Sequence, residues 1–165
     1  MMVALGWFVG ILVSCTIIHD AFEVMLVPRR VKRRWRLTRY YYRWAWRLWS
    51  RVARLTAEGA RRERFLSVFG SLSMTLLFAL WAAVLILAFG LMQWSAAQTG
   101  GHRPAPGLGE QIYLSGVTFF TLGFGDLTPQ TSAARALAVL EAGVGFGLIA
   151  VVILLLRTAG IDVHV

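Results

Sequence analysis

The sequence has one cysteine, Cys15, among its 165 residues, and this cysteine lies inside an apolar run. A single thiol provides neither a disulfide framework nor a thiolate metal site within one chain. The sequence also lacks a visible Ser/His/Asp set, a metal-ligand cluster and a nucleotide-binding loop. These absences argue against a disulfide-stabilised scaffold, and we expect the protein not to be an enzyme.

Charge is scarce outside one segment of the chain. Of the 17 basic residues, 14 fall between Arg29 and Arg64, and they dominate the net charge of +9. Elsewhere the chain is strongly apolar, so that 58% of all residues are hydrophobic and the mean hydropathy is +0.64. This composition excludes an ordinary soluble domain and indicates a small membrane protein.

Three apolar segments are long enough to cross a bilayer, which takes about 20 residues. They cover residues 1–27, 65–94 and 132–157. Cytoplasmic loops near membrane helices carry an excess of Lys and Arg, so we expect residues 28–64 on the cytoplasmic side of the cell membrane. The N-terminus then lies outside, and residues 158–165 form a short cytoplasmic tail.

The segment between the second and third spans, residues 110–129, is moderately apolar but too short to span a bilayer. It predicts a re-entrant loop, because irregular backbone at membrane depth is tolerated only where it is buried in protein or lines a water-filled path. Residues 111–121 are expected to form a short helix that enters from outside, and the chain then returns in extended form. The alternative is that Gly123-Phe124-Gly125-Asp126 forms an ordinary extracellular turn.

Residues 118–126 read Thr-Phe-Phe-Thr-Leu-Gly-Phe-Gly-Asp. This segment resembles the pore loop of potassium channels, whose pattern is T-x-x-T-x-G-x-G-D, and the order of elements over residues 65–157 resembles the same family. The resemblance implies an all-α membrane protein with a re-entrant pore helix, a selectivity filter at residues 121–126 (the filter segment), K⁺ as the bound ion, and a homotetramer. Leu122 and Phe124 resemble the variants in the second pore loops of two-pore-domain potassium channels.

The resemblance also assigns roles to individual residues. Backbone carbonyls would replace the hydration shell of K⁺, and they would come from Thr121, Leu122, Gly123 and Phe124, with the Thr121 hydroxyl added. Alternating residues must then take backbone angles that are costly for a side chain with a Cβ, which explains the glycines. The expected supports of the filter segment are Thr118, Gly125, Asp126 and Glu141.

Two departures from the common family pattern bear on how the filter segment is held. Phe124 lacks the hydroxyl that usually ties this segment to the pore helix. Val117, one turn before Thr121, offers no carboxylate to pair with Asp126. We therefore expect a less rigidly braced filter, with softened selectivity as one consequence.

The third span contains glycines and one acidic residue whose roles are left open. Gly143, Gly145 and Gly147 are candidates for a gating hinge, and the alternative is close packing through the G-x-x-x-G face that Gly143 and Gly147 form. Glu141 is an ionisable group inside a span, where such groups are functional by default. It either lines the cavity and attracts cations, or faces the pore helix and braces the filter segment through Ser115 or Thr118.

The basic segment carries arginines spaced by three or four residues, which gathers them within an arc of about 120°. They are Arg36, Arg39, Arg43, Arg47, Arg51 and Arg54. The pattern predicts an amphipathic helix at the cytoplasmic membrane interface, with anionic lipids as partners. A voltage sensor and a nucleic-acid site fit less well, because the spacing is irregular and the membrane setting explains the same residues.

One further cluster lies toward the inner end of the first span, where His19, Asp20 and Glu23 follow closely. It reads either as an interfacial group that pairs with nearby arginines or as a proton-sensing site.

Together the patterns favour passive K⁺ permeation. The alternatives are a weakly selective cation channel and a membrane-anchored scaffold that acts through the basic segment.

Overall fold

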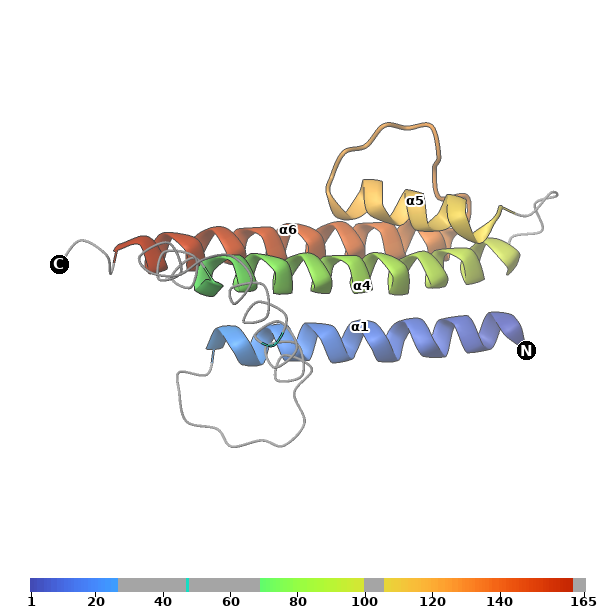
Figure 1. Cartoon of the computed structure of the whole chain (residues 1–165). Coiled ribbons are helices and arrows are strands. Elements are labelled where there is room, and N and C mark those ends of the chain that lie inside the picture. Colours follow the sequence, from blue (N-terminus) through green and yellow to red (C-terminus); the bar gives the residue numbers. More distant parts are fainter. Residues whose placement is uncertain (27–46, 48–68, 100–105, 162–165) are drawn as a thin grey trace. The chain divides into compact units, whose positions relative to one another are not determined.

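The computed structural model describes residues 1–26, 47, 69–99 and 106–161. Its elements are α1 (Met2–Leu26), α4 (Phe69–Thr99), α5 (Leu108–Phe119) and α6 (Ser132–Ile161) (Figure 1). No strand occurs in these residues. By length and composition three of the helices can cross a membrane, over Met2–Ala21, Thr75–Thr99 and Ser132–Ile153. The expectation of an all-α membrane protein with three spans is confirmed.

The ends of the elements differ from the boundaries expected from hydropathy. α4 ends at Thr99 rather than at residue 94, and its last turns include Ser95 and Thr99, whose hydroxyls donate to the carbonyls of Leu91 and Ala96. These bonds satisfy the two hydroxyl groups within the helix. α5 lies slightly earlier than the expected 111–121, and α6 continues into the expected tail.

The chain divides into two compact units, of which the smaller is Asp20–Leu80. In this unit Asp20 and Ala21 are buried near the end of α1, and Leu77 and Phe78 are buried on α4. Most of the predicted interfacial helix lies outside the described residues, but Arg47 is helical and exposed. The roles expected for the basic face and for the His19 cluster stay predictions.

The larger unit joins Met1–His19 to Trp81–Val165. Within it, α1 packs closely on α4, because a Cβ on Gly6 would overlap the Ser95 hydroxyl and a Cβ on Gly10 would lie 2.9 Å from the Ala88 carbonyl oxygen. Small residues at every fourth position let membrane helices approach in this way. The sequence pattern that indicates this contact is Gly6-x-x-x-Gly10-x-x-x-Ser14.

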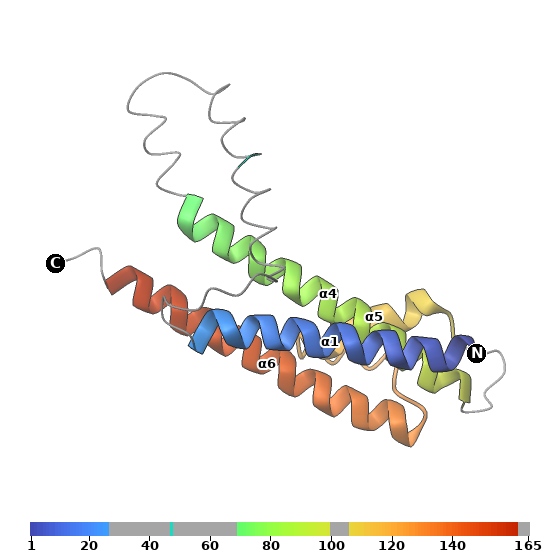
Figure 2. The same cartoon turned by 90° about the horizontal axis from the view of Figure 1, so that it is seen from below.

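α5 lies beside α4 and α6 in both views of the ribbon (Figure 1 and Figure 2), and two glycines make these contacts close. On α4, a Cβ at Gly90 would lie 2.8 Å from the Cα of Ile112. On α6, a Cβ at Gly145 would overlap the carbonyl oxygen of Phe119. The short helix is therefore fixed by backbone contacts on two sides.

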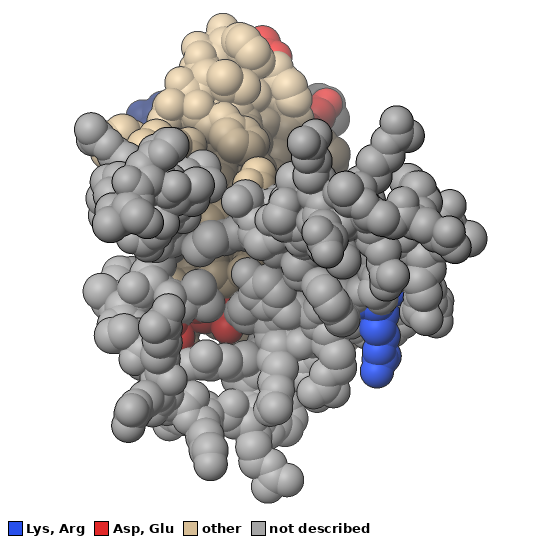
Figure 3. Space-filling model, turned by 60° about the vertical axis from the view of Figure 1, so that its left-hand side comes forward, with Lys and Arg blue, Asp and Glu red and all other residues tan. Residues whose placement is uncertain are grey.

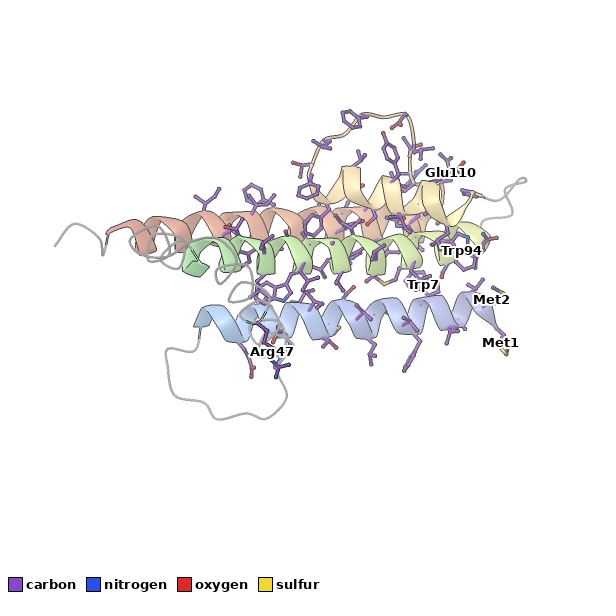
Figure 4. The ribbon with its side chains drawn as sticks, viewed as in Figure 1. Met1, Met2, Trp7, Arg47, Trp94 and Glu110 are labelled. Carbon is purple, nitrogen blue, oxygen red and sulfur yellow. The ribbon has the colours of Figure 1, made fainter. Side chains whose placement is uncertain are left out.

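Charged side chains are few on the described part of the face that Figure 3 shows. Aromatic residues mark one end of the larger unit instead, where Trp7 of α1 and Trp94 of α4 lie near the N-terminus (Figure 4). Tryptophan is enriched where membrane helices meet the headgroups. This end of the helices is therefore suited to a membrane–water interface.

Candidate functional site

The filter segment begins at the C-terminal end of α5. The N–H of Thr121 donates to the Thr118 carbonyl at 3.0 Å, and the N–H of Leu122 donates to the Val117 carbonyl at 2.9 Å. After these bonds the chain has no regular secondary structure until α6, and it arches back along α5 (Figure 1). The last turn of α5 is thus hydrogen-bonded to the start of the filter segment through the Thr118 carbonyl, and the path of the chain fits the expected re-entrant loop.

Every second residue of the filter segment has a left-handed backbone conformation. The φ angles are +54° at Thr121, +62° at Gly123 and +78° at Gly125. Glycine adopts such angles without steric cost, whereas a residue with a Cβ is destabilised by about 1–2 kcal/mol. Thr121 therefore carries backbone strain, which is typical of functional sites. Backbone angles that favour glycine were expected at Gly123 and Gly125, whereas the positive φ at Thr121 was not predicted.

The carbonyl oxygens of the filter segment are free to bind a ligand. Within the described part of the chain, no hydrogen-bond donor reaches the carbonyls of residues 121–125. The side chains of Leu122 and Phe124 are exposed, with relative accessibilities of 55% and 65% in the single chain. Backbone carbonyls at membrane depth need partners, and a dehydrated cation is one.

Tyr113 holds the end of the filter segment. Its phenol donates a hydrogen bond to the Asp126 carboxylate, with an Oη to Oδ2 distance of 2.8 Å. This bond raises the pKa of Tyr113 above its usual 10.0, with smaller contributions from desolvation and from the negative charge of Asp126. The partner of Asp126 was not predicted from the sequence, because the expected partner was a carboxylate at position 117, whereas the phenol lies one helical turn earlier on the same side of α5.

Glu141 lies inside a polar cluster that three helices build. Gln93 of α4, Ser115 of α5 and Glu141 of α6 each have 0% relative accessibility. The Ser115 hydroxyl oxygen is hydrogen-bonded to Oε1 of Glu141 and lies 2.8 Å from the carbonyl oxygen of Ile86. Of the two roles left open for Glu141, this geometry favours contact with α5, through Ser115 rather than Thr118.

The three glycines of α6 have different surroundings. Gly145 meets the last turn of α5 at Phe119, whose ring is fully buried. A Cβ on Gly143 or on Gly147 would meet no atom within 4 Å in the single chain. Close packing inside one chain therefore involves Gly145 and not the G-x-x-x-G pair that the sequence suggested. The hinge role stays a prediction.

Comparison with known proteins agrees with this geometry. A family model described as an ion channel matches residues 74–161, which is more than half of the chain. The chain is similar to Protein LctB of Bacillus caldotenax, with 32% identity over 44% of this chain and 62% of the relative. Protein LctB of Geobacillus stearothermophilus is similar at 31% identity over the same shares.

The chain spans about three fifths of the length of these curated relatives. No solved structure matches it. The family match contains α5, the filter segment and all of α6, and it joins them to the spanning part of α4. The protein is therefore a multi-pass membrane protein that belongs to the ion-channel family with the potassium-channel pore loop.

Proposed function

We propose that this protein conducts K⁺ passively through a pore that four copies of the chain build together. The observation that carries the proposal is the filter segment, with positive φ at alternate residues and carbonyls that have no donor within the described part of the chain. K⁺ can leave its hydration shell only where oxygens replace the lost water. Carbonyls of residues 121–124 and the Thr121 hydroxyl are the proposed ligands.

The tetramer is proposed because one filter segment supplies oxygens from one side of an ion only. Rings of carbonyls around K⁺ need the same segment from several chains, and four are used in pores of this kind. Large apolar side chains of α6 are exposed in the single chain and suit contact with other copies or with lipid. They are Val139, Leu140, Phe146, Ile149 and Ile153.

The supports of the filter segment fit selective rather than loose binding of the ion. Tyr113 ties Asp126 to the middle of α5, and the bonds of Thr121 and Leu122 tie the other end of the segment to the last turn of α5. These ties limit how far the carbonyl rings can widen. A weakly selective cation channel is the second candidate, because Phe124 has no hydroxyl to add a further tie.

The orientation and the lipid partners follow from charge. We place the N-terminus outside and residues 28–64 on the cytoplasmic side, where their excess of basic residues is favoured. Anionic lipid headgroups are the proposed partners of this segment.

Uptake of ⁸⁶Rb⁺ into liposomes that contain the purified protein tests the proposal. A K⁺ gradient should drive uptake well above that of protein-free liposomes. Gly123→Ala is the matched control, because its φ of +62° opposes a Cβ although no neighbouring atom would clash with it. We expect this variant to form the assembly and to lose uptake. Wild-type uptake no higher than that of empty liposomes would contradict the proposal.

A further inference from the structure

The contacts of the Ser115 hydroxyl indicate whether Glu141 carries a proton. Its hydroxyl oxygen lies within hydrogen-bonding distance of two acceptors, the Ile86 carbonyl at 2.8 Å and the Glu141 carboxyl. A serine hydroxyl has one hydrogen but two lone pairs. If that hydrogen points to an ionised Glu141, the oxygens of Ser115 and Ile86 lie 2.8 Å apart with no hydrogen between them.

The other arrangement satisfies both contacts. Ser115 donates to the Ile86 carbonyl, and the hydrogen between Ser115 and Glu141 then belongs to Glu141. This requires Glu141 to be a neutral carboxylic acid, which donates one hydrogen and still accepts at its second oxygen.

The surroundings of Glu141 agree with a neutral side chain. The groups that face it are the Gln93 amide from α4 and the Ser115 hydroxyl from α5, and neither is charged. In the described part of the chain no basic side chain pairs with it. A fully buried carboxylate without a cationic partner is costly, and such groups take up a proton instead.

We propose that Glu141 is a proton-bearing positioning residue, which donates to Ser115 while Ser115 donates to the Ile86 carbonyl. This relay joins α6 to α5 and α5 to α4 at a level where all three helices are in contact. The second oxygen of Glu141 and both amide atoms of Gln93 have no hydrogen-bond partner among the described residues. Because the Gln93 side chain faces Glu141, its N–H is the donor suited to that oxygen.

The inference rests on the proposed function in one respect, namely that α5 is the helix that carries the filter segment. A neutral brace holds α5 without placing a negative charge behind the carbonyl rings. It follows that an amide should replace the acid, because glutamine also offers one donor group and one acceptor of similar shape. A carboxylate that acted through its charge would not tolerate this exchange.

The direct test is infrared spectroscopy of the protein in lipid at neutral pH. We expect a carbonyl band of a protonated carboxylic acid that is absent from Glu141→Gln. Glu110→Gln is the matched control and should keep the band, because Glu110 is exposed and accepts from the Gly107 N–H. Absence of the band from the wild type, or its persistence in Glu141→Gln, would overturn the inference.

Variants provide a second readout. Glu141→Gln should keep the assembly and its thermal stability close to those of the wild type. Glu141→Ala and Ser115→Ala should each lower the ratio of folded to unfolded protein by about 10- to 100-fold, because a buried polar partner is left unsatisfied. A Glu141→Gln variant as unstable as Glu141→Ala would overturn the inference.

Neither measurement depends on ion flux. A protein that shows the band but carries no ⁸⁶Rb⁺ would contradict the proposed function and leave the protonated brace intact. If Glu141→Ala fails to fold, the wild-type spectrum with ¹³C-labelled glutamate still decides the question, because the label shifts a band that belongs to glutamate. A band that the label leaves in place would overturn the inference.

Discussion

Gly145→Ala tests whether the glycine at this position of α6 permits close packing against α5 rather than bending of the helix. The added Cβ would overlap the Phe119 carbonyl oxygen and lie 3.0 Å from the carbonyl carbon and 3.2 Å from the Cα of the same residue. All three are backbone atoms of the last helical turn before the filter segment, so a side-chain rotation cannot relieve the overlap. The substitution must instead push α6 and the end of α5 apart.

The expected cost follows from two opposing effects. Overpacking a close contact destabilises a protein by about 1–3 kcal/mol. Replacing glycine by alanine inside a helix returns up to about 1 kcal/mol. The net destabilisation should be about 1–2 kcal/mol, which corresponds to a roughly 5- to 30-fold change in an equilibrium constant.

The assay compares the thermal stability of the assembled protein and its ⁸⁶Rb⁺ uptake across three variants. Gly143→Ala and Gly147→Ala are matched controls, because their Cβ atoms would meet nothing within 4 Å in one chain. We expect Gly145→Ala to lower both quantities and the controls to leave stability unchanged or slightly raised. Equal behaviour of Gly145→Ala and Gly143→Ala would refute the packing argument.

Four further predictions concern other residues. Tyr113→Phe removes the hydrogen bond from the phenol to the Asp126 carboxylate, so we expect currents in planar bilayers to decay faster than those of the wild type. Unchanged decay would show that this bond does not hold the filter segment. The pKa of Tyr113 is raised above 10.0, so the contribution of this bond is fully present below pH 10.0 and is lost as the pH rises through the raised pKa. The decay of wild-type currents should therefore approach that of Tyr113→Phe at strongly alkaline pH. A constant difference between the two proteins would count against the phenol as donor. Phe124 is 65% exposed and can present its ring to external tetraethylammonium. Phe124→Val should therefore weaken the block of the current by this ion about 2- to 30-fold. Equal block in a variant that still conducts would mean that the ring does not contact the blocking ion. Gly10→Ile should separate α1 from α4 near Ala88. The variant should still take up ⁸⁶Rb⁺, since the family match begins at residue 74 and does not include α1. Loss of uptake without loss of assembly would show that α1 takes part in conduction.

Features that depend on length and local pattern could be predicted from the sequence. Each span is a long apolar run, and hydropathy alone separates it from the polar segments. The position of the filter segment follows from a motif in which Gly123 and Gly125 are required by backbone conformation, and both have positive φ. Such signals need no knowledge of which helix faces which.

Features that depend on the rotation of a helix about its axis, or on how the chain after α5 folds back along that helix, could not be predicted. Choosing between a cavity role and a brace for Glu141 requires the rotation of α6, which a helix that is apolar on all sides does not encode. The same rotation decides that Gly145, rather than its neighbours at 143 and 147, meets α5. The bond from Tyr113 to Asp126 forms because the chain arches back along α5, so its partners are 13 residues apart in sequence.

The α1 contact is a different case, since its signal was present in the sequence. Gly6 and Gly10 are four residues apart on one side of a span, and small residues at this spacing indicate helix packing. The end of α4 also differs from the expected one, because hydropathy follows the apolar side chains, whereas the helix continues through polar residues to Thr99.

The reversal potential of the current in planar bilayers tests the central claim most directly, with K⁺ on one side and Na⁺ on the other. Purified protein should give a current whose reversal potential lies far from zero, in the direction that K⁺ permeation sets. We propose that the carbonyl oxygens of the filter segment replace the water around K⁺, and hydrogen bonds tie both ends of this segment to α5. Gly123→Ala should give no such current. A wild-type current that reverses near zero would mean that Na⁺ passes as readily as K⁺, and it would contradict the claim that this protein is a K⁺-selective channel.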